Sequence, residues 1–216
     1  MSAPVRRRRP EARPSEIIAA ALEEFTAKGF AATRLDDVAQ RAGLSKGAIY
    51  LYFTDKRALL RGVVEEMATT NVAAFRAQVE RHEGAAAPLL QAVLLALAQR
   101  IAGSPLPHLI KLIIAESRGQ PEIGRLYLET VIQRAVPVIR ELIERGIAAG
   151  EFRPVDADLT VRCVVGPMLL AALWRSVFEP IGGEPLDVEA LARQHADILI
   201  RGLAAGAVPN EPGRPS

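Results

Sequence analysis

The chain has 216 residues, half of them hydrophobic, and a formal net charge of +2. This length suits one or two domains, and the composition excludes a wholly disordered or fibrous protein. The one cysteine, Cys163, cannot form an internal disulfide, and the uncharged run from Cys163 to Trp174 is shorter than the roughly 20 residues that span a membrane. We therefore expect a cytoplasmic protein without a membrane span, and the N-terminal arginines are not followed by a secretory signal core.

The charge is distributed unevenly along the chain. Residues 1–61 hold twelve Lys and Arg against seven Asp and Glu, whereas residues 62–216 hold fifteen against eighteen. This asymmetry indicates either a polyanion-binding N-terminal part or a solvated surface with a disordered basic tail. We expect residues 1–14 to form a disordered basic arm and residues 207–216 a flexible tail. The arginines at 6–9 would either enter a minor groove or act as a nonspecific electrostatic tether.

Between these ends the apolar spacing predicts an all-α chain of about nine helices and no strand. Thr33 and Asp36 have the spacing of a capping pair, and Pro137 is expected to kink the helix that contains it. The fourth helix, at 1.5 Å per residue, would be roughly 39 Å long and could join two domains. The helices are expected near residues 14–29, 35–42, 45–53, 56–81, 88–102, 105–118, 121–149, 156–178 and 187–203.

Residues 35–53 have the length of a helix-turn-helix and a glycine-containing turn between two short predicted helices. Gly43 suits the turn because the chain leaving the first helix needs a residue that tolerates positive φ. Lys46 would project a cation toward a groove, and the small Gly47 and Ala48 would let the helix approach a phosphate. Tyr50 and Tyr52 would donate hydroxyls to phosphates or base edges, or would be half-buried packing residues with wet hydroxyls.

Several motifs in this region agree together in order, spacing and residue type. They are Gly29-Phe30-Ala31-Ala32-Thr33, Asp37-Val38-Ala39, the run from Ala42 to Phe53, Asp55-Lys56 and Leu59-Leu60. Over about residues 15–62 the chain closely resembles the DNA-binding domain of TetR/AcrR-type transcriptional regulators. The resemblance implies a repressor that binds operator DNA as a homodimer and is released by a small molecule. It implies DNA contacts from Thr33, Arg34, Ser45, Lys46, Gly47, Ala48, Tyr50, Tyr52 and Lys56.

The domain organisation follows from this resemblance. We expect a helix-turn-helix domain at 15–62, whose last helix continues to about 82, and a ligand-binding and dimerisation domain at 63–206. The helix at 156–178 is apolar on nearly every side, so that burying one face of it cannot suffice. Together with the stripe on 187–203 it would form a four-helix dimer interface, or else an ordinary intrachain core. The candidate interface residues are Val165, Leu169, Ala172, Leu173, Leu191, His195, Ile198 and Leu199.

A dimer of this kind must place two recognition helices in major grooves about 34 Å apart, so the operator is expected to be a near-palindrome. The C-terminal domain is expected to enclose a cavity for a hydrophobic or amphipathic effector, because charge is scarce there. For each candidate lining residue, ordinary core packing is the favoured alternative to ligand contact, and Lys111 could also be solvated. These candidates are Met67, Asn71, Phe75, His108, Lys111, Tyr127, Met168 and Trp174.

Two other functions were weighed against a regulator. A helical enzyme would need a site assembled from distant helices, because the chain has no P-loop, no nucleophile elbow and no paired cysteines. His82, His108 and His195 are too far apart for a local metal motif, so no catalytic residue, metal or cofactor is expected. A membrane-surface protein held by its arginine arm would lack a basic amphipathic helix or a lipidation motif.

Overall fold

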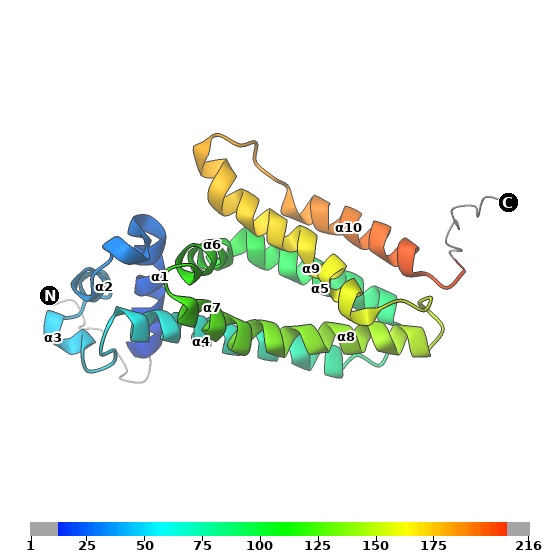
Figure 1. Ribbon diagram of the computed structural model, residues 1–216, viewed down its shortest axis with the longest axis horizontal. Helices are drawn as coiled ribbons and strands as arrows, with labels where there is room; N and C mark the ends of the chain where they lie inside the picture. The colour runs from blue at the N-terminus through cyan, green and yellow to red at the C-terminus, as the bar shows by residue number, and fades with distance from the viewer. Residues whose placement is uncertain (1–12, 207–216) are drawn as a thin grey trace, which may run out of the picture. The chain divides into compact units, whose positions relative to one another are not determined.

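The computed structural model describes residues 13–206 of the chain, and the side chains of residues 13, 67–71 and 74 are not part of that description. Within this range the protein is all-α, as expected, with ten α-helices and no strand (Figure 1). The helices are α1 (Arg13–Ala32), α2 (Leu35–Arg41), α3 (Lys46–Ile49), α4 (Lys56–Glu80), α5 (Ala86–Gly103), α6 (Leu106–Ser117), α7 (Pro121–Tyr127), α8 (Gln133–Ala148), α9 (Ala157–Leu173) and α10 (Val188–Leu203).

The chain divides into two compact units. The first unit holds residues up to Ala73 together with His108–Ile132, and the second holds Ala74–Pro107 together with the residues from Gln133 onward. Helix α4 thus gives its N-terminal part to the first unit and its last turns to the second.

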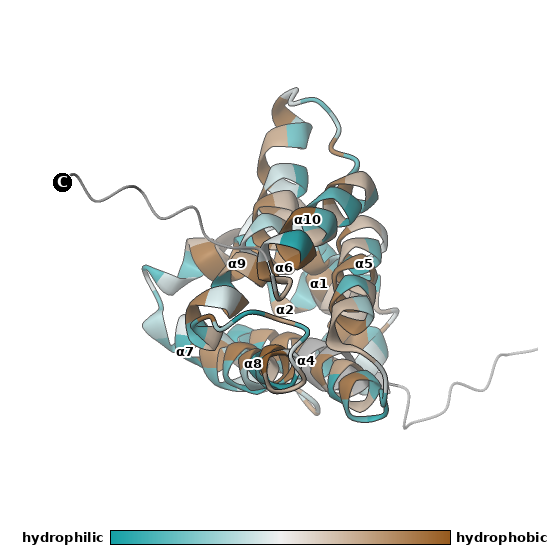
Figure 2. Cartoon of the chain, turned by 90° about the vertical axis from the view of Figure 1, so that its right-hand side faces the viewer, coloured by the Kyte–Doolittle hydropathy of each residue, from teal (hydrophilic) through white to brown (hydrophobic). Residues whose placement is uncertain are grey.

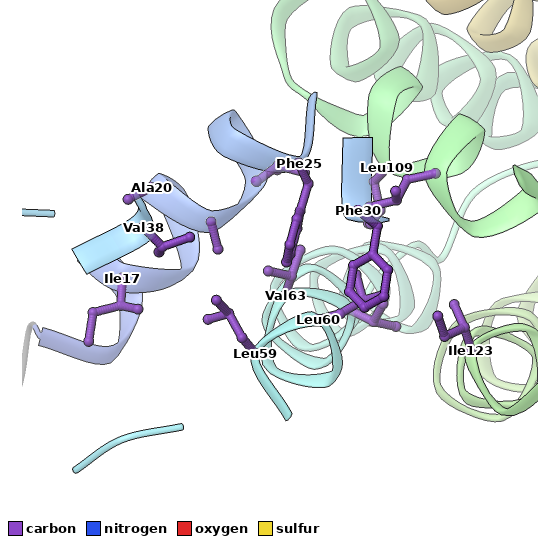
Figure 3. Packing of buried hydrophobic residues seen from close by; sticks show 14 of the residues in the cluster. Ile17, Ala20, Phe25, Phe30, Val38, Leu59, Leu60, Val63, Leu109 and Ile123 are labelled. Atoms are coloured by element: carbon purple, nitrogen blue, oxygen red, sulfur yellow. The ribbon is translucent and has the colours of Figure 1, made fainter. Parts of the chain in front are cut away.

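The core of the first unit joins α1, α2 and α3 to α4, α6 and α7. Phe25 and Phe30 of α1 pack against each other with ring centroids 5.3 Å apart. Figure 3 shows the Phe30 ring beside Leu60 of α4 and near Leu109 of α6, with the Phe25 ring above Val63, and all of these side chains are buried. Because helices this short are marginal alone, α2 and α3 depend on this shared core for their positions.

The core of the second unit is built on α5, which packs against α8, α9 and α10. Helices α9 and α10 lie side by side and also contact each other (Figure 1). In Figure 2 the turns of α5 are mostly brown or pale, whereas α10 alternates between hydrophobic and hydrophilic residues. The buried face of α10 holds Val188, Ala192, Ala196 and Leu203, at the spacing of one helical face.

Most helices begin within a few residues of the predicted positions, but the third helix ends at Ile49 and not near residue 53. Asp55 and Asp187 accept hydrogen bonds from the amides of Ala58 and Ala190, at 2.8 and 2.9 Å, and so cap α4 and α10. The predicted capping pair of Thr33 and Asp36 is wrong by one residue. Arg34 is the N-cap of α2, and its amide donates to the Asp37 carboxylate at 3.2 Å.

The kink expected at Pro137 is also misplaced. Pro137 lies inside α8, and the helical run is interrupted earlier, by a π turn at Leu128–Ile132. Proline lacks an amide hydrogen, and its ring crowds the carbonyl four residues before it, which here belongs to Gln133. The π turn ends immediately before Gln133, so the irregular backbone precedes the proline by one turn.

Two helical segments are long and apolar enough to span a membrane by length and composition, Ala86–Gly103 and Ala157–Ile181. The short length of the uncharged run from Cys163 to Trp174 therefore does not by itself exclude a membrane-spanning helix. Core helices of globular domains can be equally long and apolar, and both α5 and α9 pack within the second unit.

Candidate nucleic-acid interface

The turn between α2 and α3 has the geometry of a helix-turn-helix. Gly43 has φ 66°, as its place in the turn requires, and the Leu44 amide donates to the Ala39 carbonyl at 2.8 Å. Val38 and Ala39 of α2 and Ile49 of α3 are fully buried, so the two helices are fixed through their apolar faces. The other face of α3 is left outward.

That outward face combines a cation with two aromatic hydroxyls. The Lys46 side chain is 79% exposed, and Tyr50 and Tyr52 are 52% and 42% exposed. A Cβ added at Gly47 would meet nothing within 4 Å, so the space above α3 is open. Ser45 is the N-cap of α3 but makes no side-chain cap bond, which leaves its hydroxyl exposed for another partner.

Lys46 is held by a neighbouring carboxylate. Its ammonium lies 2.7 Å from a carboxylate oxygen of Asp36, and this hydrogen bond raises the pKa of Lys46 above its ordinary value. The pair lies at a surface hollow of about 550 Å³ in the first unit. The hollow is lined by Arg34, Asp36, Asp37, Gln40, Leu44, Ser45 and Lys46.

Two residues for which the resemblance implies DNA contact form side-chain hydrogen bonds within the protein instead. Thr33 is 2% exposed, and its hydroxyl lies 2.7 Å from the Gly29 carbonyl and 3.2 Å from that of Glu24. The Lys56 ammonium donates to the carbonyls of Phe30 and Ala31. The bonds of Lys56 are not visible in the local sequence, because its partners in α1 lie 25 and 26 residues earlier in the chain.

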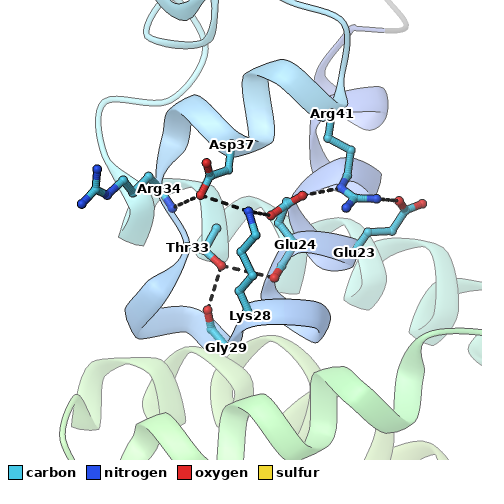
Figure 4. Close-up of polar contacts among 8 residues, drawn as sticks. All are labelled: Glu23, Glu24, Lys28, Gly29, Thr33, Arg34, Asp37 and Arg41. Atoms are coloured by element: carbon cyan, nitrogen blue, oxygen red, sulfur yellow. Dashed lines mark hydrogen bonds and ion pairs between the residues drawn. The ribbon is translucent and has the colours of Figure 1, made fainter.

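A cluster of ion pairs joins α1 to α2 behind this surface (Figure 4). Glu24 is 4% exposed, and its carboxylate lies 2.6 Å from Nε of Arg41 and 2.8 Å from Nζ of Lys28. Hydrogen bonds hold the pKa of Glu24 below its ordinary range, and the bond from Lys28 contributes more than the bond from Arg41. Lys28 also contacts Asp37 at 3.3 Å, so the cluster reaches the first turn of α2.

Sequence reasoning missed two side chains on this surface. Leu51 is 84% exposed between the two tyrosines, and Gln40 of α2 lines the hollow. The sequence signal for Leu51 is its position between Tyr50 and Tyr52, the two tyrosines expected to face DNA. The signal for Gln40 was its position three residues before the turn glycine, on the outer side of α2.

The candidate effector-binding residues fall in both units. His108, Lys111 and Tyr127 belong to the first unit, and burial raises the pKa of the Tyr127 hydroxyl. In the second unit Phe75 is half-buried and Met168 is fully buried.

Trp174, also in the second unit, has its ring 5.2 Å from that of Phe178, and its indole donates to the Glu184 carbonyl at 2.9 Å. The predictions for Met67 and Asn71 concern side chains outside the described ones, and the arm at 1–12 lies outside the described residues. A second hollow, of about 430 Å³, contains none of the candidates and is lined by His82, Glu83, Gly84, Ala86, Arg145, Ala148, Ala149 and Glu151.

The candidate dimer residues differ in how exposed they are. Leu169 on α9 and Ile198 on α10 are 44% and 61% exposed, whereas Ala172 is fully buried within the chain. His195 lies 3.1 Å from the Val164 carbonyl and so helps to join α10 to α9. Val165, Leu173, Leu191 and Leu199 are half-buried. Leu159 and Leu170, which were not among the candidates, add to the exposed apolar surface of α9.

Comparison with known families matches both parts of the chain. Residues 17–63 match the family described as bacterial regulatory proteins, tetR family, and residues 84–198 match the family described as tetracyclin repressor-like, C-terminal domain. The chain is similar to the HTH-type transcriptional regulator YhgD of Bacillus subtilis, with 29% identity over 195 residues, which cover 88% of this chain and 95% of YhgD.

Two further relatives carry more specific names. The HTH-type transcriptional repressor KstR2 of Mycolicibacterium smegmatis is 23% identical over 196 residues, covering 90% of this chain and 92% of KstR2. The structure of the transcriptional regulator FadR from Bacillus subtilis in complex with stearoyl-CoA has a TM-score of 0.73 at 20% identity and covers 88% of this chain and 98% of FadR. This last likeness shows the fold.

Proposed function

Because the chain belongs to the TetR family of bacterial transcriptional regulators, we propose that it is a repressor that binds a near-palindromic operator as a homodimer. In this proposal α3 and the turn after it lie in the major groove, and a small hydrophobic or amphipathic effector releases the DNA. The observation that carries the proposal is the exposed surface of α3 and the turn after it, where Lys46, Tyr50 and Tyr52 are exposed and the space at Gly47 is open.

The DNA contacts divide into positioning and reading. The Lys46 ammonium exchanges Asp36 for a phosphate, and the Tyr50 hydroxyl donates to a phosphate oxygen. Tyr52 and the exposed Leu51 face base edges, where an apolar group can contact a thymine methyl. Arg34 and Ser45, at the hollow, and the small residues Gly47 and Ala48 complete the contact surface.

Dimerisation is proposed through α9 and α10. The exposed leucines of α9 and Ile198 of α10 lie on helices that contact each other, so they offer one apolar surface to a second copy. A two-fold interface uses the same patch on both partners, and two reading heads then require two half-sites. Leu169 and Ile198 are the central contacts of this proposal.

The effector is proposed to act by preferring the conformation that cannot bind DNA. A hundredfold loss of operator affinity requires about 2.7 kcal/mol of coupling, and an effector with equal affinity for both conformations would have no effect. FadR is seen with stearoyl-CoA, a molecule with a long apolar chain and a charged head, which supports an amphipathic effector here. The relatives are named as transcriptional regulators, so we propose a cytoplasmic regulator and no catalytic activity.

Selection of bound duplexes from a random pool tests the proposal. The wild-type chain is expected to enrich a near-palindrome, and Lys46→Ala combined with Tyr50→Ala is expected to abolish enrichment. The variant's helical content and molecular mass should match those of the wild type, because both side chains are exposed. Enrichment by the variant would overturn the assignment of α3, and binding to lipid vesicles without any duplex would overturn the function itself.

A further inference from the structure

Lys56 is the first residue of α4, and its ammonium binds the end of α1. Its Nζ donates to the Phe30 carbonyl at 2.5 Å and to the Ala31 carbonyl at 2.8 Å. The same atom lies 4.6 Å from the centroid of the Phe30 ring, in a cation–π contact. Three interactions from one half-buried side chain therefore connect two helices of the first unit.

The end of α1 needs a donor from outside the helix. The backbone leaves the helical conformation at Gly29, which has φ 78°, and the last carbonyls of a helix have no partner within it. α1 carries no basic residue in its last turn, and Thr33 already binds the Gly29 carbonyl through its amide and its hydroxyl. Lys56 supplies the donors for the next two carbonyls.

The position of Lys56 in α4 is otherwise unfavourable for a cation. The N-terminus of a helix carries a partial positive charge, whereas the C-terminus of a helix carries a partial negative charge. At this junction the C-terminal carbonyls of α1 compensate the cation at the start of α4. Phe30 is 3% exposed and packs on Phe25, so the group that receives Lys56 belongs to the rigid core.

The junction lies immediately before α2, which packs against α3. Arg34, the N-cap of α2, follows Ala31 by three residues, and α2 carries α3 through buried contacts. We propose that Lys56 is a positioning residue for operator binding, which acts by joining the first turn of α4 to the end of α1 and not by binding a phosphate. This inference rests on the proposed function, and it gives Lys56 a role different from the DNA contact that the family resemblance implies.

Arginine and glutamine substitutions separate the two roles of Lys56. A guanidinium keeps the charge and can also lie on an aromatic ring, but it is larger and planar, so it does not keep the 2.5 and 2.8 Å contacts that the single Nζ makes with the two carbonyls. A positioning role therefore predicts that Lys56→Arg and Lys56→Gln both weaken binding of the selected duplex, each by about tenfold. A phosphate contact predicts that Lys56→Arg binds almost as well as the wild type.

The salt dependence of the same binding gives the second readout. Each lost phosphate contact lowers the slope of log affinity against log salt by about 0.9. We expect the wild-type slope for both Lys56 variants and a slope lower by about 0.9 for Lys46→Gln, the matched control on the exposed face of α3. A slope lowered by Lys56→Gln together with affinity retained by Lys56→Arg would overturn the inference.

A measurement on the wild-type chain covers the case in which the variants fold poorly. Nitrogen-detected NMR of the lysine ammonium groups, without and with the selected duplex, should show a Lys56 signal that DNA leaves unchanged. A Lys56 signal that shifts on binding while its carbonyl contacts are lost would contradict the inference. If neither the wild type nor any variant binds DNA, the proposed function fails together with this inference. If Lys46→Gln lowers the salt slope as expected while Lys56→Arg binds as well as the wild type, the positioning role alone is refuted.

Discussion

Replacing Glu24 with alanine removes the buried carboxylate that joins α1 to α2. Breaking a buried ion pair costs about 3–5 kcal/mol when the remaining charge stays buried. Here the Arg41 and Lys28 side chains are 41% and 46% exposed, and each keeps a second carboxylate, from Glu23 and Asp37 respectively. The expected loss therefore falls to that of one charged hydrogen bond, about 2 kcal/mol of unfolding free energy.

Leucine at position 24 is the matched control. It fills the volume with an apolar group but, like alanine, it removes the carboxylate from Lys28 and Arg41. We expect Glu24→Leu to recover only the part of the loss that comes from packing, about 1 kcal/mol, and to remain less stable than the wild type. The comparison between the two variants thus separates the volume of the side chain from its charge.

Guanidinium chloride unfolding at pH 7, followed by circular dichroism, measures both variants. We expect a lower midpoint for Glu24→Ala with an unchanged denaturant slope. The single tryptophan, Trp174, lies in the second unit, so its fluorescence reports on a part of the chain that Glu24 does not contact. The reasoning fails if Glu24→Ala loses less than about 0.5 kcal/mol, or if Glu24→Leu costs as much as Glu24→Ala.

The pH dependence of the difference has a defined sign. Because Lys28 and Arg41 lower the pKa of Glu24 in the folded chain, the stabilisation is fully present above the pKa of the unfolded chain. It is lost as the pH falls through the lower, folded-state pKa. The wild type should therefore lose its advantage over Glu24→Ala in acid, whereas a difference that is independent of pH would show that the charge is not responsible.

Three further perturbations test other parts of the structure. Asp36→Asn removes the partner of Lys46 and a negative charge beside the proposed DNA surface, so duplex affinity measured by fluorescence anisotropy should rise about two- to fivefold, and an unchanged or weaker affinity would count against the contact. Met168→Ala should cost about 2–5 kcal/mol in a Trp174-detected unfolding curve, because the side chain is 1% exposed, and a loss below that range would mean that the site collapses. Leu169→Glu combined with Ile198→Glu should halve the mass seen in sedimentation, and an unchanged mass would place the dimer contact elsewhere.

Local signals in the sequence were enough to predict most of the helices. Gly43 predicted the turn because few residues other than glycine tolerate its positive φ, and the apolar spacing predicted helices that begin near residues 56 and 187, where Asp55 and Asp187 accept bonds from amides three residues later. The apolar spacing of α2 likewise predicted that Val38 and Ala39 would be buried.

The errors lie where a tertiary contact competes with a local pattern. Thr33 has the residue type of an N-cap, but its hydroxyl is buried against α1, where it binds the Glu24 carbonyl nine residues earlier as well as that of Gly29, and Arg34 is the N-cap. The partners of Lys56 are 25 and 26 residues away in the chain, beyond any helical spacing. The π turn at 128–132 lies before Pro137, and its position is not signalled by a proline or glycine within it. The DNA-contact and effector residues stay predictions, since they depend on a molecule that binds there.

Hydroxyl-radical footprinting of the wild-type chain on the selected duplex tests the central claim most directly. Two copies that each present α3 to a major groove should protect two blocks whose centres are about 10 base pairs apart, related by two-fold symmetry. Lys46→Ala combined with Tyr50→Ala should remove both blocks together. One unpaired block, or protection that survives in this variant, would contradict the account.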